Sequence, residues 1–370
     1  MSSPSSSTRS VGIASPMSIS SSSSSSTSRI SIEQEIHETT PRTNDFTTKY
    51  TIEEQRRLHK GAKLFMEETL RGIGAKVTFI SPPQLPYPKL ESVEITKNLD
   101  RKIFSAELTT KIEENIQADA QRIDKSIVIY GVASKYNCGV SEQIEPVVPG
   151  KAFHVLCEET SYTRKYDDFT YGLIVQLQFG PKQVELVNCA AHKGFNGLAF
   201  VLEEETKGAV INGVFHPTNE AQRAWVIHQL QHQGHRLEMP CIVKEPWIAG
   251  VKRPIHIILS AAPDFKEKST DPSHQAQENE IQFLCALLNY RAQFNHVIQV
   301  AQMTSQSVIF KPMAIGLGER KNDPLILAKA FYTVVREYIS ELQNYHVHVK
   351  LQVMNSPDAK QMASYLKLNT

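Results

Sequence analysis

The sequence lacks two features that would each assign it to a class of protein. No run approaches the roughly 18–20 consecutive apolar residues of a membrane helix, so we expect no membrane association. Lys and Arg number 40 against 39 Asp and Glu, and this balance gives no broad basic face for a nucleic acid duplex. Binding of a small anionic ligand is compatible with this charge balance, because backbone amides and helix N-termini bind phosphate without net positive charge.

Cysteines are few, odd in number and widely spaced along the chain. They are Cys138, Cys157, Cys189, Cys241 and Cys285. No two form a CxxC pair, which argues against a disulfide framework and against a zinc ribbon. A reducing, cytoplasmic compartment fits this pattern.

The first 50 residues contain little apolar material and no secretory signal, but many serines, with an unbroken run from Ser20 to Ser26. Such a segment buries too little apolar surface to offset its ordering entropy, so we expect residues 1–50 to form a disordered tail. Residues 51–125 follow as an expected helical accessory segment. It contains a helix over Thr51–Gly74, a proline-dense connection and a second helix over about Ser105–Arg122.

From Ile127 onward, short apolar strands alternate with longer helical patterns. The expected strands are Ile127–Val132, Gly172–Phe179, Val184–Ala190, Ile255–Ala261, Ser307–Ile315 and His346–Met354. The expected helices are Glu220–Gln233, Glu278–Met303 and Leu325–Leu342, the last with Asp323 as N-cap and Pro324 at its first position. This alternation predicts an α/β sandwich with a mixed sheet over residues 126–370.

The stretch Val184–Glu205 carries the strongest chemical signal. A buried strand runs into Asn188, then into a loop with Gly194 and Gly197, then into the acidic triplet Glu203–Glu205. Glycines let backbone N–H groups approach a pyrophosphate closely. Neighbouring carboxylates suit chemistry at a glycosidic carbon, where one protonates the leaving group and others hold the sugar.

This spacing resembles that of macrodomain hydrolases of the poly(ADP-ribose) glycohydrolase family. In that family, a strand ends in Asn, and a Gly-Gly-Gly loop and a Gln-Glu-Glu motif follow. The resemblance implies a three-layer macrodomain sandwich, preceded by accessory helices, that binds ADP-ribose. It implies that Glu204 is the catalytic acid/base, that Glu203 orients the ribose, and that Asn188 contacts the distal ribose. No metal and no cofactor is expected.

Further ligand contacts follow from the same resemblance. They are Gly194, Phe195, Asn196 and Glu205 in the first loop, and Gly316, Leu317, Gly318, Arg320 and Asp323 downstream. Gly316-Leu317-Gly318 follows an expected strand and precedes a long helix, as does the second diphosphate-binding loop of macrodomains.

Several positions depart from the family pattern. His192 and Lys193 replace two loop glycines, and Leu202 stands where Gln is expected. In the second loop Arg320 replaces a ring-stacking Phe, and Lys321-Asn322 replace two glycines. These changes leave open a linkage other than poly(ADP-ribose), such as one to a protein side chain.

Two alternatives to hydrolysis therefore stay open. One is an ADP-ribose reader without turnover, and the other is an interaction protein that uses the fold as a scaffold. The serine-rich tail would suit a bacterial effector in a host cytosol that acts on ADP-ribosylated protein, ubiquitin included.

Two other groups of residues favour plainer interpretations. His228 and His232 fall one helical turn apart, a spacing that can bind metal, but neighbouring apolar residues indicate an ordinary packing helix. Cys189 lacks a His–Asp partner motif, so a small core residue is expected there rather than a nucleophile.

Overall fold

The computed structural model describes residues 76–110, 112–133, 210–211, 214–215, 219–246, 251–266, 269–318 and 320–368. Seven strands form one sheet: β1 (Lys76–Ile80), β2 (Phe104–Thr109), β3 (Ile127–Ala133), β6 (Met239–Lys244), β7 (Ile255–Ser260), β8 (Val308–Pro312) and β9 (Val347–Met354). The helices are α3 (Ile112–Gln121), α8 (Glu220–Gln233), α9 (Pro272–Thr304), α10 (Pro324–Asn344) and α11 (Pro357–Tyr365). Shorter elements are η1 (Leu90–Ser92), η3 (Gly234–Arg236), β4 (Val210–Ile211) and β5 (Val214–Phe215). None of these helices is both long and apolar enough to cross a membrane.

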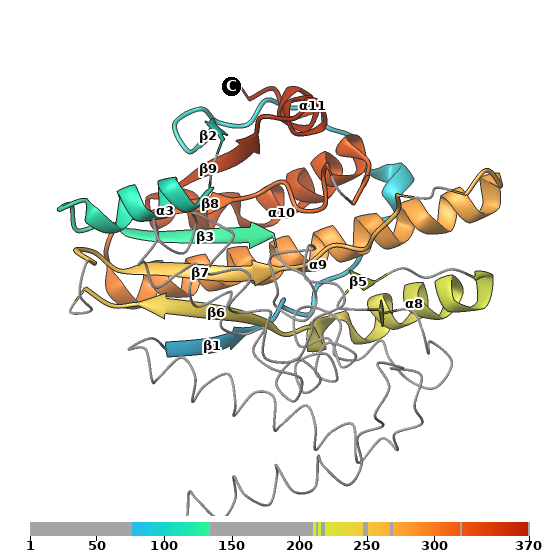
Figure 1. The fold of residues 1–370 in the computed structure, drawn as a ribbon, viewed down its shortest axis with the longest axis horizontal. Helices are drawn as coiled ribbons and strands as arrows, with labels where there is room; N and C mark the ends of the chain where they lie inside the picture. The colour runs from blue at the N-terminus through green and yellow to red at the C-terminus, as the bar shows by residue number, and fades with distance from the viewer. Residues whose placement is uncertain are drawn as a thin grey trace, which may run out of the picture. The chain divides into compact units, whose positions relative to one another are not determined.

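The sheet is mixed, with the strand order β1-β6-β7-β3-β8-β9-β2. The pairs β7–β3, β3–β8, β8–β9 and β9–β2 are parallel, whereas β6 is antiparallel to both of its neighbours. In Figure 1 the arrows of β3 and β7 run the same way and that of β6 runs against them. The predicted α/β class with a mixed sheet is confirmed.

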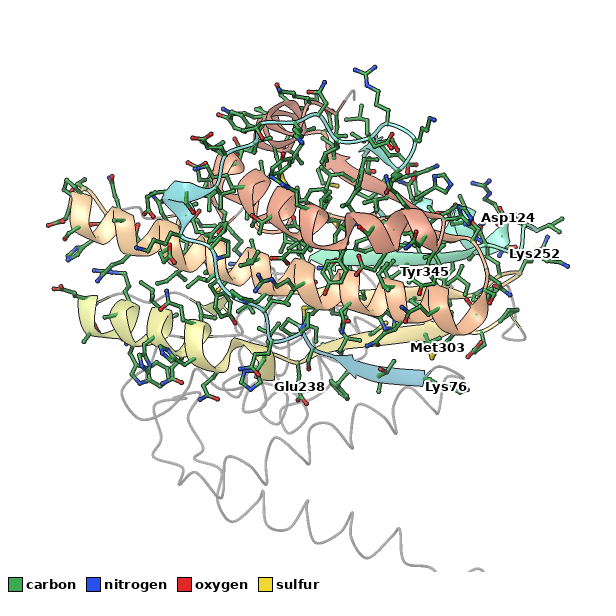
Figure 2. All side chains as sticks on the ribbon, turned by 180° about the vertical axis from the view of Figure 1, so that it is seen from behind. Lys76, Asp124, Glu238, Lys252, Met303 and Tyr345 are labelled. Atoms are coloured by element: carbon green, nitrogen blue, oxygen red, sulfur yellow. The ribbon has the colours of Figure 1, made fainter. Side chains whose placement is uncertain are left out.

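Helices cover both faces of the sheet. The strand β9 alternates as predicted, with Val347, Val349, Leu351 and Val353 at most 1% exposed and His348 exposed on the opposite face. The apolar face packs against α9 and α10, which lie nearest the viewer in Figure 2. α3 lies over the other face, where the Tyr130 hydroxyl donates to Asp119 of α3 at 2.6 Å. Helix, sheet and helix make the expected three layers.

Aromatic rings fill the space between the sheet and its two long helices. The ring of Phe294 on α9 meets Phe310 of β8 edge-on at 5.1 Å between centroids and Phe331 of α10 at 5.8 Å. Edge-to-face packing of this kind is favourable beyond the area that it buries. It holds α9 and α10 in place over the centre of the sheet.

Caps set the boundaries of the long helices. Asp271 accepts from the backbone N–H groups of Ser273 and His274, and Pro272 occupies the first turn, so α9 begins six residues before the predicted Glu278. The expected cap Asp323, the helix α10 and the range of α8 are confirmed.

The predicted helix over Ser105–Arg122 is wrong in its first half. Residues Phe104–Thr109 form β2, which pairs in parallel with β9, and the helix α3 begins only at Ile112. β1 also belongs to the main sheet, at its opposite edge. In its described part, residues 76–125, the expected accessory segment is therefore not a purely helical unit but supplies both edge strands.

The proline-rich connection after β1 is anchored on the long helices. Arg291 of α9, fully buried, donates to Glu337 of α10 at 2.9 Å, and also to the carbonyl oxygens of Leu85 and Pro86. Its guanidinium stacks on the ring of Tyr87, 5.3 Å from the centroid. A bidentate, stacked arginine of this kind fixes an otherwise irregular segment.

A network of buried charges lies on the α3 face. Asp119 accepts from Lys311 of β8 at 2.8 Å and from Tyr130 of β3, with Arg253 at 3.5 Å. Lys311 also pairs with Glu107 of β2 at 3.2 Å. Burial alone would raise the pKa of Asp119, but the hydrogen bonds from Lys311 and Tyr130 and the nearby positive charges outweigh it and hold the pKa below its usual range.

The expected strands Gly172–Phe179 and Val184–Ala190 and the expected helix Thr51–Gly74 lie outside the described residues. The expected tail over residues 1–50 does so as well.

Candidate functional site

The candidate site lies where the central parallel strands end. β3, β7 and β8 run in the same direction, so their carboxyl ends meet at one edge of the sheet. Ligands of open α/β sheets bind at this edge. The segments that leave β7 and β8 there, residues 261–265, 313–318 and 320–323, form the described part of the site.

The loop after β8 adopts backbone conformations that favour glycine. Gly316 has φ +85° and Gly318 has φ +80°. A Cβ at Gly316 would lie 2.7 Å from the Cβ of Ala262 and 2.7 Å from the Nδ2 of Asn322, whereas one at Gly318 would meet nothing within 4 Å. Lys321, which stands where the family pattern has glycine, also takes a left-handed conformation, with φ 52°.

Side chains tie this loop to the segment after β7. The amide Nδ2 of Asn322 donates to the carbonyl oxygens of Pro263 at 2.8 Å and Gly316 at 3.1 Å. Arg320 donates to the carboxylate of Asp264 at 2.8 Å, and both of these side chains are largely buried. The Gly316 turn is therefore held in its shape by contacts that need no ligand.

The N-terminus of α10 opens onto the same loop. Asp323 Oδ1 accepts from the backbone N–H groups of Leu325 at 2.8 Å and Ile326 at 3.3 Å. The Asp323 N–H in turn donates to Gln282 of α9 at 2.8 Å. The turn with positive φ at Gly316 and Gly318 can present backbone N–H groups to a phosphate or diphosphate group, whereas Pro324 has no N–H and the next two N–H groups of α10 are bound by its own cap.

The expected site residues fall into two groups. Gly316, Leu317, Gly318, Arg320 and Asp323 come together in this one loop, as the sequence predicted. Arg320 is engaged by Asp264, and Asp323 is a helix cap, so their contacts with a ligand stay predictions.

The remaining expected site residues lie outside the described part of the chain. They are Asn188, Gly194, Phe195, Asn196, Glu203, Glu204 and Glu205. Their roles stay predictions.

Sequence reasoning missed three residues that shape the loop. Asp264, Gln282 and Asn322 act through partners 56, 41 and 59 positions away in the chain. Contacts over such distances leave no spacing pattern for sequence reasoning to find. For Asn322 the sequence offered one clue, its place in a loop that the family resemblance had already marked.

The two histidines one turn apart on α8 lie on the surface. The rings of His228 and His232 stack at 4.1 Å between centroids, and both side chains are exposed. His232 Nδ1 lies 2.7 Å from the His228 carbonyl oxygen. Among the described residues, this pair is not part of any group of three potential metal ligands.

A hollow of about 630 Å³ lies at the other end of the sheet, where the parallel strands begin. Arg122, Lys125 and Lys350 line it together with Asp124, which Figure 2 labels at that end. Arg122 is already paired with Asp124 at 3.2 Å. Three basic side chains and one acidic side chain line the hollow, so it is open and net basic, and it lies at the opposite end of the sheet from the loop after β8.

Comparison with protein-family models and with curated proteins gave no match to this chain. Among solved structures, the chain is similar to the poly(ADP-ribose) glycohydrolase from Deinococcus radiodurans in complex with ADP-ribose. The match has 14% identity and a TM-score of 0.37, and covers 82% of this chain and 97% of that one. The glycohydrolase from Thermomonospora curvata matches at 12% identity and a TM-score of 0.30, over 85% of this chain and 98% of that one. Since identities and TM-scores are low, the functional proposal rests on the residues of this chain.

Proposed function

We propose that this chain binds ADP-ribose and hydrolyses an ADP-ribosyl glycosidic linkage. The observation that carries the proposal is the loop after β8, where two glycines with positive φ precede the Asp323-capped N-terminus of α10 at the carboxyl edge of a parallel sheet. Such a loop suits the diphosphate of ADP-ribose, because a glycine turn with positive φ can offer backbone N–H groups rather than surplus basic side chains.

The catalytic roles come from the sequence motif between Asn188 and Glu205. Glu204 would protonate the leaving oxygen or nitrogen as the anomeric C–O or C–N bond breaks, and water would add to the oxocarbenium-like carbon and return a proton to Glu204. Glu203 would hold the ribose, and Asn188 would contact the distal ribose. The scheme needs no metal for the chemical step.

A reader without turnover is the second candidate function. His192 and Lys193 occupy two positions where the family has glycine, and a Cβ at such a position hinders a tight phosphate turn. Loss of precise ribose positioning lowers the rate of hydrolysis far more than it lowers the affinity for ADP-ribose, because a small displacement of the reacting atoms is enough to slow the reaction.

Titration calorimetry of the full chain with ADP-ribose tests the binding step, with Asn188→Ala and Gly316→Val beside the wild type. We expect saturable binding that both substitutions weaken, while the exposed Glu94→Gln leaves it unchanged. Absence of heat and of a thermal shift with ADP-ribose up to about 1 mM would overturn both the hydrolase and the reader, and would leave a scaffold protein.

Release of ADP-ribose from ADP-ribosylated proteins and from poly(ADP-ribose) then separates the enzyme from the reader. In an enzyme, Glu204→Gln abolishes release and keeps binding. In a reader, the wild type binds and releases nothing. Action on ADP-ribosylated host protein in a cytosol, ubiquitin included, is part of this proposal, and it predicts activity on protein-linked substrates.

A further inference from the structure

Three side chains with metal-binding atoms meet inside the described core, away from the loop after β8. They are Cys241 of β6, His256 of β7 and His296 of α9, and their donor atoms all lie within 4.8 Å of one another. Cys241 is fully buried, His296 is 8% exposed and His256 is partly buried. The three residues come from three different elements, with no spacing motif in the sequence.

The sheet register places the cluster on the face that α9 covers. Cys241 pairs with Ile258 and His256 pairs with Val243, so the two side chains are diagonal neighbours on one face of the antiparallel pair β6–β7. His296 reaches them from the helix above. The surroundings are apolar core, where a polar imidazole ring needs a partner.

The distances between these atoms are close to the edges of a tetrahedron around a zinc-sized ion. Zinc binds imidazole nitrogen at about 2.0–2.1 Å and thiolate sulfur at about 2.3 Å, so neighbouring ligands stand roughly 3.3–3.6 Å apart. Cys241 Sγ lies 3.5 Å from His296 Nε2, and His256 Nδ1 lies 3.0 Å from the same nitrogen. The first distance lies within this range, the second is shorter than it, and the donor atoms of Cys241 and His256 lie within 4.8 Å of each other, so an ion would be bound after small movements of these side chains.

One nitrogen, His296 Nε2, lies within hydrogen-bonding distance of both of the other side chains. If His296 Nε2 carries a lone pair, that one lone pair faces two donors, the Cys241 thiol and the His256 Nδ1–H. Burial in the apolar core disfavours the charged form of both imidazole rings. Neutral imidazole is the form that binds metals.

We propose that Cys241, His256 and His296 bind a divalent ion of the zinc class, with water at the fourth position. A mixed thiolate and imidazole ligand set favours zinc over magnesium or calcium, which prefer oxygen. On binding, the ion displaces the thiol proton of Cys241 to solvent and joins two strands of the sheet to α9. The site is structural, and it is independent of the proposed hydrolysis.

Cobalt substitution of the full chain tests the site. The protein is stripped with a chelator and titrated with Co²⁺, then with Zn²⁺. We expect one equivalent of Co²⁺ with tetrahedral d–d bands and a thiolate-to-cobalt charge-transfer band, both lost as Zn²⁺ replaces it. Chelation should lower the Tm of the wild type, and added Zn²⁺ should restore it.

Matched variants assign the signal to these residues. Cys241→Ala should lose the charge-transfer band and the response of its Tm to chelator, whereas Cys285→Ala, which also removes a fully buried thiol, should keep both. His256→Gln should weaken binding, and the exposed His348→Gln should not. A wild type without the cobalt–thiolate band, or a Cys241→Ala variant that retains it, would overturn the proposal. The measurement on the wild type tests the proposal even if a variant fails to fold.

Discussion

At the scale of single residues, the loop after β8 contains two positions that favour glycine, and one of them does so for an additional reason. Gly316 and Gly318 share nearly the same φ, +85° and +80°. Only Gly316 is also crowded, because a Cβ there would press on Ala262 and on the amide of Asn322. The two positions therefore separate backbone strain from steric contact.

We expect Gly318→Ala to cost about 1–2 kcal/mol of unfolding free energy, the usual strain of a side chain in the left-handed region. Gly316→Ala should cost roughly 1–3 kcal/mol more, because the overpacked neighbours must move as well. Urea unfolding of the two variants beside the wild type measures the difference. Equal losses of unfolding free energy in the two variants would mean that Ala262 and Asn322 move aside at no cost, and that their contact with residue 316 does not shape the loop.

Sequence reasoning could identify Gly316 and Gly318, because a Gly-x-Gly after a strand leaves a visible pattern. It could not identify Asn322 as the residue whose side chain holds the turn in its shape. The role of Asn322 depends on the carbonyl oxygen of Pro263, 59 positions away, and that proximity exists only once β7 and β8 lie in one sheet.

At the scale of elements, α10 joins the candidate site to the core. Its first turn carries the Asp323 cap, and its buried face includes Phe331 and Val334. Helix stability and loop geometry are therefore coupled at one residue.

We expect Asp323→Ala to lower the unfolding free energy by about 1 kcal/mol, because two backbone N–H groups lose their acceptor. Asp323→Asn keeps an acceptor oxygen, so its unfolding free energy should fall by only about a few tenths of a kcal/mol. Chemical denaturation monitored by circular dichroism measures both. A wild-type midpoint for Asp323→Ala would show that solvent replaces the cap at no cost.

The same scale shows where sequence patterns mislead. The apolar residues Leu108, Ile112 and Ile116 are spaced as on one helix face, yet Leu108 belongs to β2 and the other two to α3. Strand β6 went unrecognised because Pro240 interrupts a short apolar run. In the structure Pro240 is paired only on one side, with Phe79 of β1, because the pairing of β6 with β7 begins at Cys241.

At the scale of the whole molecule, the Asp119 network joins elements from opposite ends of the described chain. Asp119 of α3 contacts β3 and β8, and through Lys311 it is linked to Glu107 of β2. Removal of one partner from such a network leaves a buried charge without compensation.

This network predicts a dependence of stability on acid. Because the pKa of Asp119 is lower in the folded state than in the unfolded chain, its stabilising contribution is complete above about pH 4 and is lost as the pH falls through the folded value. Asp119→Asn should cost about 3–5 kcal/mol near neutral pH and should flatten the loss of stability below about pH 4. Urea midpoints between about pH 7 and pH 3 test this, with the exposed Asp100→Asn as control. An unchanged acid slope in Asp119→Asn would assign the acid sensitivity to other carboxylates.

Both outer strands of the sheet come from the chain before β3, and this has a consequence for synthesis on the ribosome. β2 is translated early, but the strand beside it is β9, and the contact between Glu107 and Gln352 spans 245 positions. At about 5–20 residues per second, the nascent β2 waits roughly 10–50 s for its partner. During that interval its hydrogen-bonding edge is unpaired, so β2 is made early and pairs late, whereas β1 can pair as soon as β6 has been made.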